Sequence, residues 1–254
     1  MSAPIDFPYC GQAPVPSEWL GQWNLDPTLL VAMAALSALH VAVLIRTNEL
    51  PSRKYWVAAV WIMLVGLFIS PLCALSSALY SVRVAHHVVL IALVAPALVM
   101  SLPSAWRSAA SYKAGGVILI VNIAIVWLWH APAPYAAAMS SDMLFWVMQL
   151  GLLLSALALW HAVLAPAAPF GGSLTLLLGM VLQMGLLGAL ITFARSPLYA
   201  PHFGTTEPFG LDTMADQQLA GLIMWVPATL PYLAAALLLI GRGLAGAATA
   251  RRPA

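Results

Sequence analysis

The sequence contains very little charge. Only 7% of its 254 residues are Asp, Glu, Lys or Arg, whereas 63% are hydrophobic, and the mean hydropathy is +0.94. A soluble domain of this size needs a much larger charged fraction to cover its surface. The composition therefore predicts an integral membrane protein. The net charge of only +2 offers no basic patch to nucleic acid.

Cysteine is scarce, and the common catalytic motifs are missing. The two cysteines cannot build a disulfide framework, and they show neither CxxC nor zinc-ribbon spacing. We find no GxSxG elbow, HExxH helix, P-loop or GxGxxG fingerprint, so we do not expect an enzyme. Residues 1–27 lack a basic region followed by an apolar core, so we expect a Pro-rich tail and no cleavable signal peptide.

Long apolar runs are abundant instead. A bilayer core needs about 20 apolar residues per helix, and these runs lack the alternation of barrel strands. We predict an all-α bundle of seven transmembrane helices within a membrane domain over residues 28–241, followed by a basic tail over residues 242–254. The predicted helices are Thr28–Ile45, Tyr55–Leu75, Ala85–Leu102, Ala114–His130, Met143–Leu164, Ser173–Phe193 and Gln218–Ile240.

The basic residues lie mostly on one side of this predicted bundle. If the N-terminal tail is outside, only Arg83 and Arg195 lie outside with it. The other eight of the ten Lys and Arg residues then lie on the cytoplasmic side, namely Arg46, Arg53, Lys54, Arg107, Lys113, Arg242, Arg251 and Arg252. Cytoplasmic loops of membrane proteins carry such an excess. We therefore predict that the N-terminus is outside and the C-terminus is cytoplasmic.

Several residues that can bind metals fall at the outer level of the predicted membrane. Cys73 ends the second predicted helix there. His86 and His87 begin the third, and His130 ends the fourth. Ionisable groups at the edge of a bilayer are costly and are therefore candidates for function. Because cysteine and histidine together suit copper, we predict an outer metal site with the candidate ligands His87, His130, His86 and Cys73.

The seventh predicted helix opens at the same level with a run of three polar residues. Asp216 has the residue type that caps a helix N-terminus. Capping leaves the two glutamines that follow unexplained. We expect Asp216, Gln217 and Gln218 to orient the metal ligands or to dock a partner protein. Cys10, in the tail, is a further candidate that could hand over an ion.

Simpler interpretations of these residues stay open. An interfacial histidine or arginine often only hydrogen-bonds a carbonyl or reaches the headgroups, and Cys73 has the character of a small buried hydrophobe. His86 and His87 lie about 100° apart around a helix, so we expect only one of them to face the bundle. We assign Gln149 to hydrogen bonding between helices.

Other functions fit the same histidines. In a b-type cytochrome, His87 and His130 would ligate one haem, and the inner histidines His40 and His161 a second. Small residues one turn before the inner pair, Ser37 and Ala158, leave room for a macrocycle. A metal-free scaffold subunit is another alternative. The inner half lacks a ladder of polar ligands, which disfavours a copper permease.

Several stretches of the sequence resemble one known family. They are YCGQAPVP and QWNLDP in the tail, SPLCALSSALYSVRVAHHVVL, WLWHAPAPY, LLGALITFARSPLYAP and DQQLAGLIMWVP. The chain resembles, over nearly its whole length, the CtaG-type cytochrome c oxidase assembly proteins of bacterial membranes, the multi-spanning family linked to caa-type oxidases. It is not similar to the single-span copper chaperone that shares the CtaG name.

The resemblance implies an inner-membrane protein that helps to mature the copper centres of an oxidase. Its implied partners are cytochrome c oxidase subunits, periplasmic copper chaperones and membrane lipid. His87, His130 and the Asp216–Gln218 run fall on family motifs. The chain departs from the common pattern where Arg83 replaces a histidine, His86 a glutamine and Cys73 an aspartate, and where Leu150 replaces a further histidine.

Overall fold

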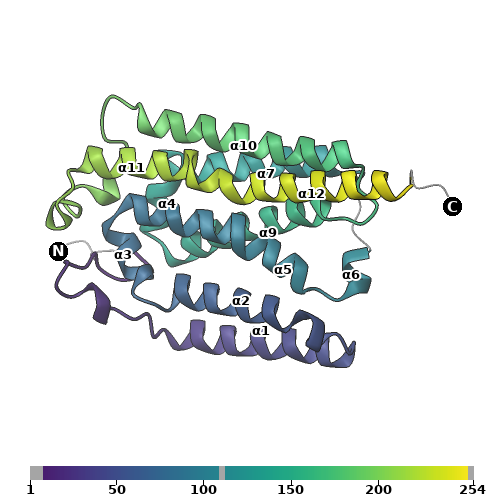
Figure 1. The fold of residues 1–254 in the computed structure, drawn as a ribbon. Helices are drawn as coiled ribbons and strands as arrows, with labels where there is room; N and C mark the ends of the chain where they lie inside the picture. Colours follow the sequence, from purple (N-terminus) through teal and green to yellow (C-terminus); the bar gives the residue numbers. More distant parts are fainter. Residues whose placement is uncertain (1–7, 109–111, 251–254) are drawn as a thin grey trace.

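In the computed structural model, which describes residues 8–108 and 112–250, the described chain folds into a helical bundle without β-strands (Figure 1). Five of its helices are long and apolar enough to cross a membrane by themselves. The number rises to seven if two sharply bent helix pairs each count as one span. The all-α bundle is therefore confirmed. The count of seven and the orientation stay predictions, and Arg251 and Arg252 lie outside the described residues.

The first two helices form one side of the bundle. The Asp26 carboxylate caps α1 (Pro27–Arg46) by accepting a hydrogen bond of 2.8 Å from the backbone N–H of Thr28. α1 packs on α2 (Leu50–Phe68), and its other faces carry exposed apolar side chains. Such a face suits contact with lipid. In Figure 1 the two helices lie along the lower edge of the bundle.

Prolines cause the two bent pairs. Pro71 separates α2 from α3 (Leu72–Ala78), and the two axes meet at 44°. α7 (Gly115–His130) and α8 (Pro132–Met139) are bent by 69°. Ala131 between them is extended, with φ −73° and ψ 137°, as expected for a residue before proline. The predicted second helix, Tyr55–Leu75, is therefore broken near its end.

The most buried span runs through the middle of the bundle. It consists of α4 (Tyr80–Val89), a π-helical turn η2 (Leu90–Val94) and α5 (Ala95–Ser101). Pro96 removes a backbone N–H and clashes with the preceding turn, and the π turn absorbs this irregularity. The span starts five residues earlier than the predicted start at Ala85, so Arg83 lies inside a helix and not in a connection.

The C-terminal half of the chain supplies the other long helices. They are α9 (Asp142–Val163), α10 (Phe170–Thr192), α11 (Thr213–Trp225) and α12 (Leu230–Ala250). A 3-10 turn, η5 (Pro227–Thr229), interrupts the predicted seventh helix. α10 and α11 cross closely at Gly188 and Gly221. A Cβ on Gly188 would lie only 2.7 Å from the carbonyl oxygen of Gly221, so this approach requires glycine. Small residues permit such close crossings in membranes.

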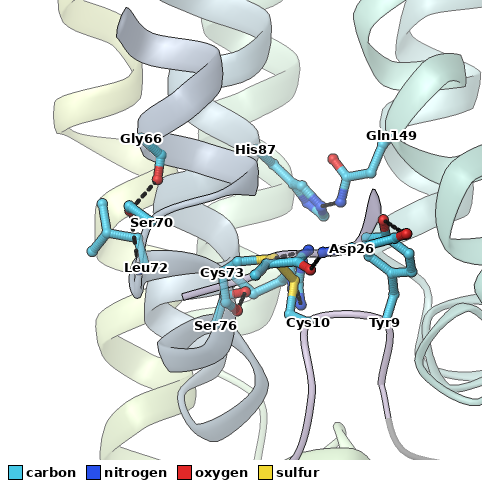
Figure 2. The surroundings of a disulfide bond; sticks show 12 residues. Tyr9, Cys10, Asp26, Gly66, Ser70, Leu72, Cys73, Ser76, His87 and Gln149 are labelled. Carbon is cyan, nitrogen blue, oxygen red and sulfur yellow. Dashed lines mark hydrogen bonds between the residues drawn. A yellow bond between two sulfur atoms is a disulfide. The ribbon is translucent and has the colours of Figure 1, made fainter. Parts of the chain in front are cut away.

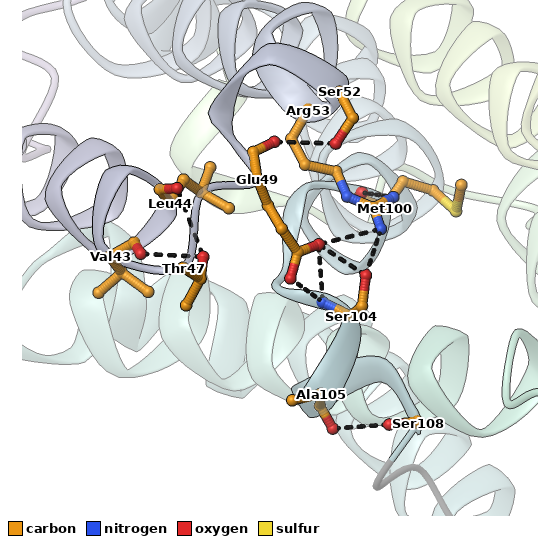
Figure 3. Close-up of polar contacts among 10 residues, drawn as sticks. All are labelled: Val43, Leu44, Thr47, Glu49, Ser52, Arg53, Met100, Ser104, Ala105 and Ser108. Carbon is orange, nitrogen blue, oxygen red and sulfur yellow. Dashed lines mark hydrogen bonds and ion pairs between the residues drawn. The ribbon is translucent and has the colours of Figure 1, made fainter.

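The connections at the two ends of the bundle differ in length. We call the end of the bundle that carries the N-terminal tail the tail end. Two segments cover α3 and α4 there: the tail, which contains η1 (Trp19–Gly21), and a long loop, which contains η3 (Ala200–His202) and η4 (Glu207–Phe209). At the opposite end, Glu49 caps the short α6 (Ser104–Ser108), accepting from the backbone N–H of Ser104 at 2.9 Å. Arg53 contacts Glu49 at 3.4 Å and donates to the carbonyl of Met100 (Figure 3).

Candidate metal site

The fold brings His87 and His130 together at the tail end of the bundle. His87 lies on α4 and His130 is the last residue of α7. Both side chains are buried, and His87 Nδ1 lies 3.4 Å from His130 Nε2. Their rings meet edge to face with centroids 5.2 Å apart. Two histidines that are 43 positions apart in the sequence therefore present ring nitrogens to each other, so their predicted proximity is confirmed. Their binding of a metal stays a prediction.

Hydrogen-bond partners fix the tautomers of this pair. His130 Nδ1 donates to the carbonyl of Val126 at 2.7 Å, which leaves His130 Nε2 as an acceptor. His87 Nδ1 then carries a proton and donates to it, while His87 Nε2 accepts from the Gln149 amide on α9 at 3.4 Å. This assignment follows from the partners alone. Gln149 thus acts on the histidine pair and not only between helices.

His86 takes a separate place on the same helix. Its side chain is also buried, but it packs edge to face against Phe68 of α2 with centroids 5.0 Å apart. Neither of its ring nitrogens has a hydrogen-bond partner among the described residues. His87 faces α7 and α9, so the two adjacent histidines point to different neighbours. The prediction that only one of them faces the bundle is wrong, because both are buried inside it and differ only in the neighbours that they contact.

Cys73 forms a disulfide with Cys10 of the tail (Figure 2). The bond links residues 63 positions apart, and it was not predicted from the sequence. A disulfide sulfur is not a thiolate, and the thiolate is the metal ligand. The prediction that Cys73 binds metal therefore concerns only a reduced state of the protein. In the disulfide state, the bond also attaches the tail to α3 at Cys10.

Aromatic contacts anchor the tail on either side of the disulfide. A turn closed by a 2.7 Å hydrogen bond from Gly11 N–H to the Pro8 carbonyl directs Tyr9 and Cys10 inward. Gly11 has φ +90°, a conformation that glycine adopts without strain. The Tyr9 hydroxyl donates to Asp26 at 2.6 Å, which holds the pKa of Asp26 below its usual range, and the Tyr9 ring stacks on Phe145. The tail thus covers the tail end of the bundle.

Arg83 lies one turn before His87 and is fully buried. No carboxylate lies within ion-pair distance of it among the described residues, and its Nε and Nη1 atoms have no hydrogen-bond partner. Its guanidinium lies over the ring of Phe145, and Nη2 is 3.9 Å from Cys10 Sγ. An arginine stays charged, so this position carries an unbalanced positive charge.

Asp216 caps a helix, but not α11, the helix in which it lies. Its carboxylate accepts from the backbone N–H groups of Tyr80 at 2.7 Å and Ser81 at 3.2 Å, and from the Ser81 hydroxyl. It therefore caps α4, while Asp212 caps α11 through Ala215 N–H. Asp216 fixes the start of the helix that carries Arg83 and His87. Its role in orienting metal ligands stays a prediction.

The two glutamines differ. Gln217 is buried, accepts from the backbone N–H of Leu198 at 2.7 Å and donates to the Ile191 carbonyl at 3.2 Å. It holds the loop that follows α10 against α11. Gln218 is exposed on α11. Gln218 is therefore free to contact lipid or another protein and takes no part in the histidine pair.

An aromatic cluster next to the site was not predicted. Tyr80 stacks on Tyr199 at 3.7 Å between ring centroids, Tyr135 shares a 2.7 Å hydrogen bond with His202, and the Tyr199 hydroxyl donates to the His130 carbonyl at 2.8 Å. Burial, together with the charge of Arg83, lowers the pKa of His202 to about 3. Tyr80 begins α4, Tyr135 lies on α8, and Tyr199 and His202 lie on the loop after α10. The sequence offers no sign that these three segments meet.

The inner histidines stand apart from this cluster. His40 Nδ1 accepts from the Trp61 indole at 3.3 Å, and His161 Nε2 contacts the Trp106 carbonyl at 3.1 Å. At the tail end, the 3.4 Å contact between His87 and His130 leaves no space for an iron and its macrocycle. The geometry therefore disfavours the haem alternative.

The arrangement at the tail end provides two facing nitrogen donors. Metal–nitrogen bonds of about 2.0 Å on opposite sides of an ion need the nitrogens about 4 Å apart, so the pair has to open by about 0.6 Å. Over residues 8–108 and 112–250, no three His, Cys, Asp or Glu side chains are grouped to hold a metal ion. A site with only two protein donors suits Cu(I), which accepts low coordination, better than zinc.

These features define a polytopic helical membrane protein with a buried polar centre at one end. A family model matches residues 38–245, and it describes the cytochrome c oxidase caa3 assembly factors. The chain belongs to this family, as the sequence motifs indicated. No curated protein and no solved structure matches it.

Proposed function

We propose that this assembly factor helps to mature a copper centre of cytochrome c oxidase at the outer face of the membrane, through transient binding of Cu(I) by His87 and His130. The observation that carries the proposal is the buried pair of facing imidazole nitrogens, 3.4 Å apart, in a chain of the oxidase assembly family. Copper is the cargo in this proposal and the oxidase is its recipient.

Gln149 has a positioning role in the proposed mechanism. Binding of Cu(I) to His87 Nδ1 requires the imidazole proton to move to Nε2. The Gln149 amide then has to turn so that its oxygen accepts that proton. Within the described chain, this oxygen has no hydrogen-bond partner and can therefore accept the proton. Outer partners of this kind fix the tautomer of metal-bound histidines.

The experiment is a copper measurement on the oxidase in cells that carry single variants. We expect His87→Ala and His130→Ala to lower the copper content and copper-centre spectra of the oxidase severalfold, with unchanged levels of the assembly factor in membranes. His40→Ala is the matched control because His40 contacts Trp61 on α2, away from the His87–His130 pair. Normal oxidase copper in both site variants would overturn the proposal.

A metal-free scaffold is the second candidate. Hydrogen bonds join α9, α4 and α7 without any ion. They run from Gln149 to His87, from His87 to His130, and from His130 to the Val126 carbonyl. Cu(I) binding by the purified protein separates the two functions. A wild-type protein that binds no more Cu(I) than the variant with both His87→Ala and His130→Ala would favour the scaffold.

A further inference from the structure

The strongest unexplained feature of the molecule is the charge of Arg83. A buried guanidinium without a counter-ion costs several kcal/mol, and arginine cannot relieve this cost by losing its proton. Within residues 8–108 and 112–250, the groups that interact electrostatically with it are His86, His87, His202 and the phenol of Tyr135, and none of these supplies a negative charge. The nearby carboxylate, Asp216, is engaged by the start of α4. The position therefore calls for an anion in some functional state.

The nearest candidate for that anion is the Cys10–Cys73 pair. Arg83 Nη2 lies 3.9 Å from Cys10 Sγ. In the disulfide state this sulfur is neutral, so it accepts a hydrogen bond only weakly and does not balance the charge of the guanidinium. Reduction produces two thiols whose Cα atoms are 5.1 Å apart, one on the tail and one on α3. Thiolates prefer Cu(I) among the biological metals.

We propose that the reduced Cys10–Cys73 pair is a second Cu(I) site, and that the buried Arg83 balances its charge. Two thiolates and one Cu(I) carry a net charge of −1, which pairs with the single positive charge of the guanidinium. This inference deepens the proposed copper function and rests on it, but it concerns a donor set distinct from His87 and His130.

The redox state of the pair then controls the site. Loading is a two-electron reduction: the S–S bond breaks, a dithiol reductant supplies two electrons and is itself oxidised to a disulfide, and the two thiolates bind Cu(I) in place of protons. Release is the reverse: a disulfide oxidant takes two electrons from the thiolates, the S–S bond forms again, and Cu(I) leaves unchanged in valence. Closure of the bond also returns the tail to its place over the tail end (Figure 2).

The test measures Cu(I) binding by the purified full-length protein in both redox states. Ascorbate keeps copper as Cu(I) in each sample, and bathocuproine disulfonate serves as the competing chelator. One sample is pre-treated with a phosphine to open the disulfide, and alkylation followed by mass measurement verifies its state. To remove the histidine site from the readout, the measurement uses the His87→Ala/His130→Ala variant as well as the wild type.

We expect the His87→Ala/His130→Ala variant to bind one Cu(I) at least 100-fold more tightly after reduction than in its disulfide form, with sulfur ligands in X-ray absorption. Addition of Cys10→Ser and Cys73→Ser should abolish this binding. Equal binding in the two redox states would overturn the proposal. So would reduced binding no stronger than in the four-residue variant.

The same measurement separates this inference from the proposed histidine site. If Cys10→Ser/Cys73→Ser binds no Cu(I) while the reduced histidine variant does, the histidine site fails and the thiolate site stands. The role of Arg83 is tested by Arg83→Met, which should weaken Cu(I) binding of the reduced protein tenfold or more, and by Arg83→Lys, which should restore part of it. Arg53→Met is the control, and unchanged affinity in Arg83→Met would overturn the charge balance.

Discussion

Two arginines at opposite ends of the bundle show how differently the two ends are built. Arg53 is partly exposed and contacts a carboxylate, a hydroxyl and a backbone carbonyl (Figure 3). Arg83 is fully buried and has no carboxylate partner in the part of the chain that the structure describes. The first arrangement is the ordinary way to tie a loop to a helix end. The second lowers stability, and a fold retains such a group where a ligand or partner compensates it.

The capping carboxylates of the two ends also differ in burial. Glu49 caps the one-turn helix α6 in contact with water, whereas Asp216 caps the buried α4 from another helix. Hydrogen bonds to a carboxylate in a water-poor interior are harder to replace than those at a surface. The tail end therefore concentrates costly polar groups, and the opposite end contains replaceable ones.

The largest expected effect comes from removal of the buried cap. We expect Asp216→Ala to lower the free energy of unfolding by about 2–4 kcal/mol, because two backbone N–H groups and one hydroxyl lose their acceptor inside the bundle. Thermal unfolding of the detergent-solubilised protein, followed by near-UV signal, measures the change. Glu49→Ala is the control at the opposite end and should shift the midpoint less than half as much. A larger shift in Glu49→Ala would contradict the comparison.

The two arginines should respond in opposite directions. Arg83→Met removes an unpaired buried charge and keeps most of the side-chain volume, so we expect it to stabilise the metal-free protein by about 1–4 kcal/mol. Arg53→Met should destabilise it slightly because Glu49 and the Met100 carbonyl lose a donor. The midpoint of the same thermal unfolding shows both signs. A lower midpoint in Arg83→Met would reveal a compensating negative charge near Arg83.

Acid should loosen the tail end selectively. His202 is neutral in the folded loop, where its pKa is about 3, and near 6.5 once the loop opens. The open state therefore binds more protons as pH falls below 6.5, and the loop loses about 2 kcal/mol of stability between pH 7 and 5. Glu49 stays ionised over this range because hydrogen bonds from Ser104 hold its pKa below the usual value.

Hydrogen exchange of the two ends checks this difference. Protection of residues 198–210 should fall between pH 7 and 5, after correction for the intrinsic exchange rate, while protection of residues 44–56 should not. His202→Gln removes the titrating group and should abolish the pH dependence at the tail end. Equal loss of protection at both ends would show that His202 is not the cause.

Much of the architecture could be read from the sequence because it depends on apolar runs of membrane length. The helices α1, α7, α9 and α10 lie close to their predicted ranges. The errors have local causes. Pro71 and Pro227 broke two predicted helices, and the start of α4 lies at Tyr80 because Asp216, 136 residues away, supplies its cap. A cap from a distant helix leaves no local signal in the sequence.

The candidate site was predictable in part. Depth in the membrane follows from counting residues along each helix, and this placed His87 and His130 at one level. Their contact, the tautomers set by Gln149 and Val126, and the separate place of His86 depend on how helices rotate and pack. The aromatic cluster with His202 depends on a loop whose path no periodicity describes.

The amino-acid sequence by itself determined that this chain is a helical membrane protein of the oxidase assembly family, because apolar length and near-continuous motifs do not require knowledge of contacts. Only the tertiary structure decided that Cys10 meets Cys73, that Arg83 is buried with no carboxylate partner among the described residues and that Asp216 caps α4. The physical reason is that these properties belong to pairs of distant residues. Their energies arise when packing removes water and fixes which groups are neighbours.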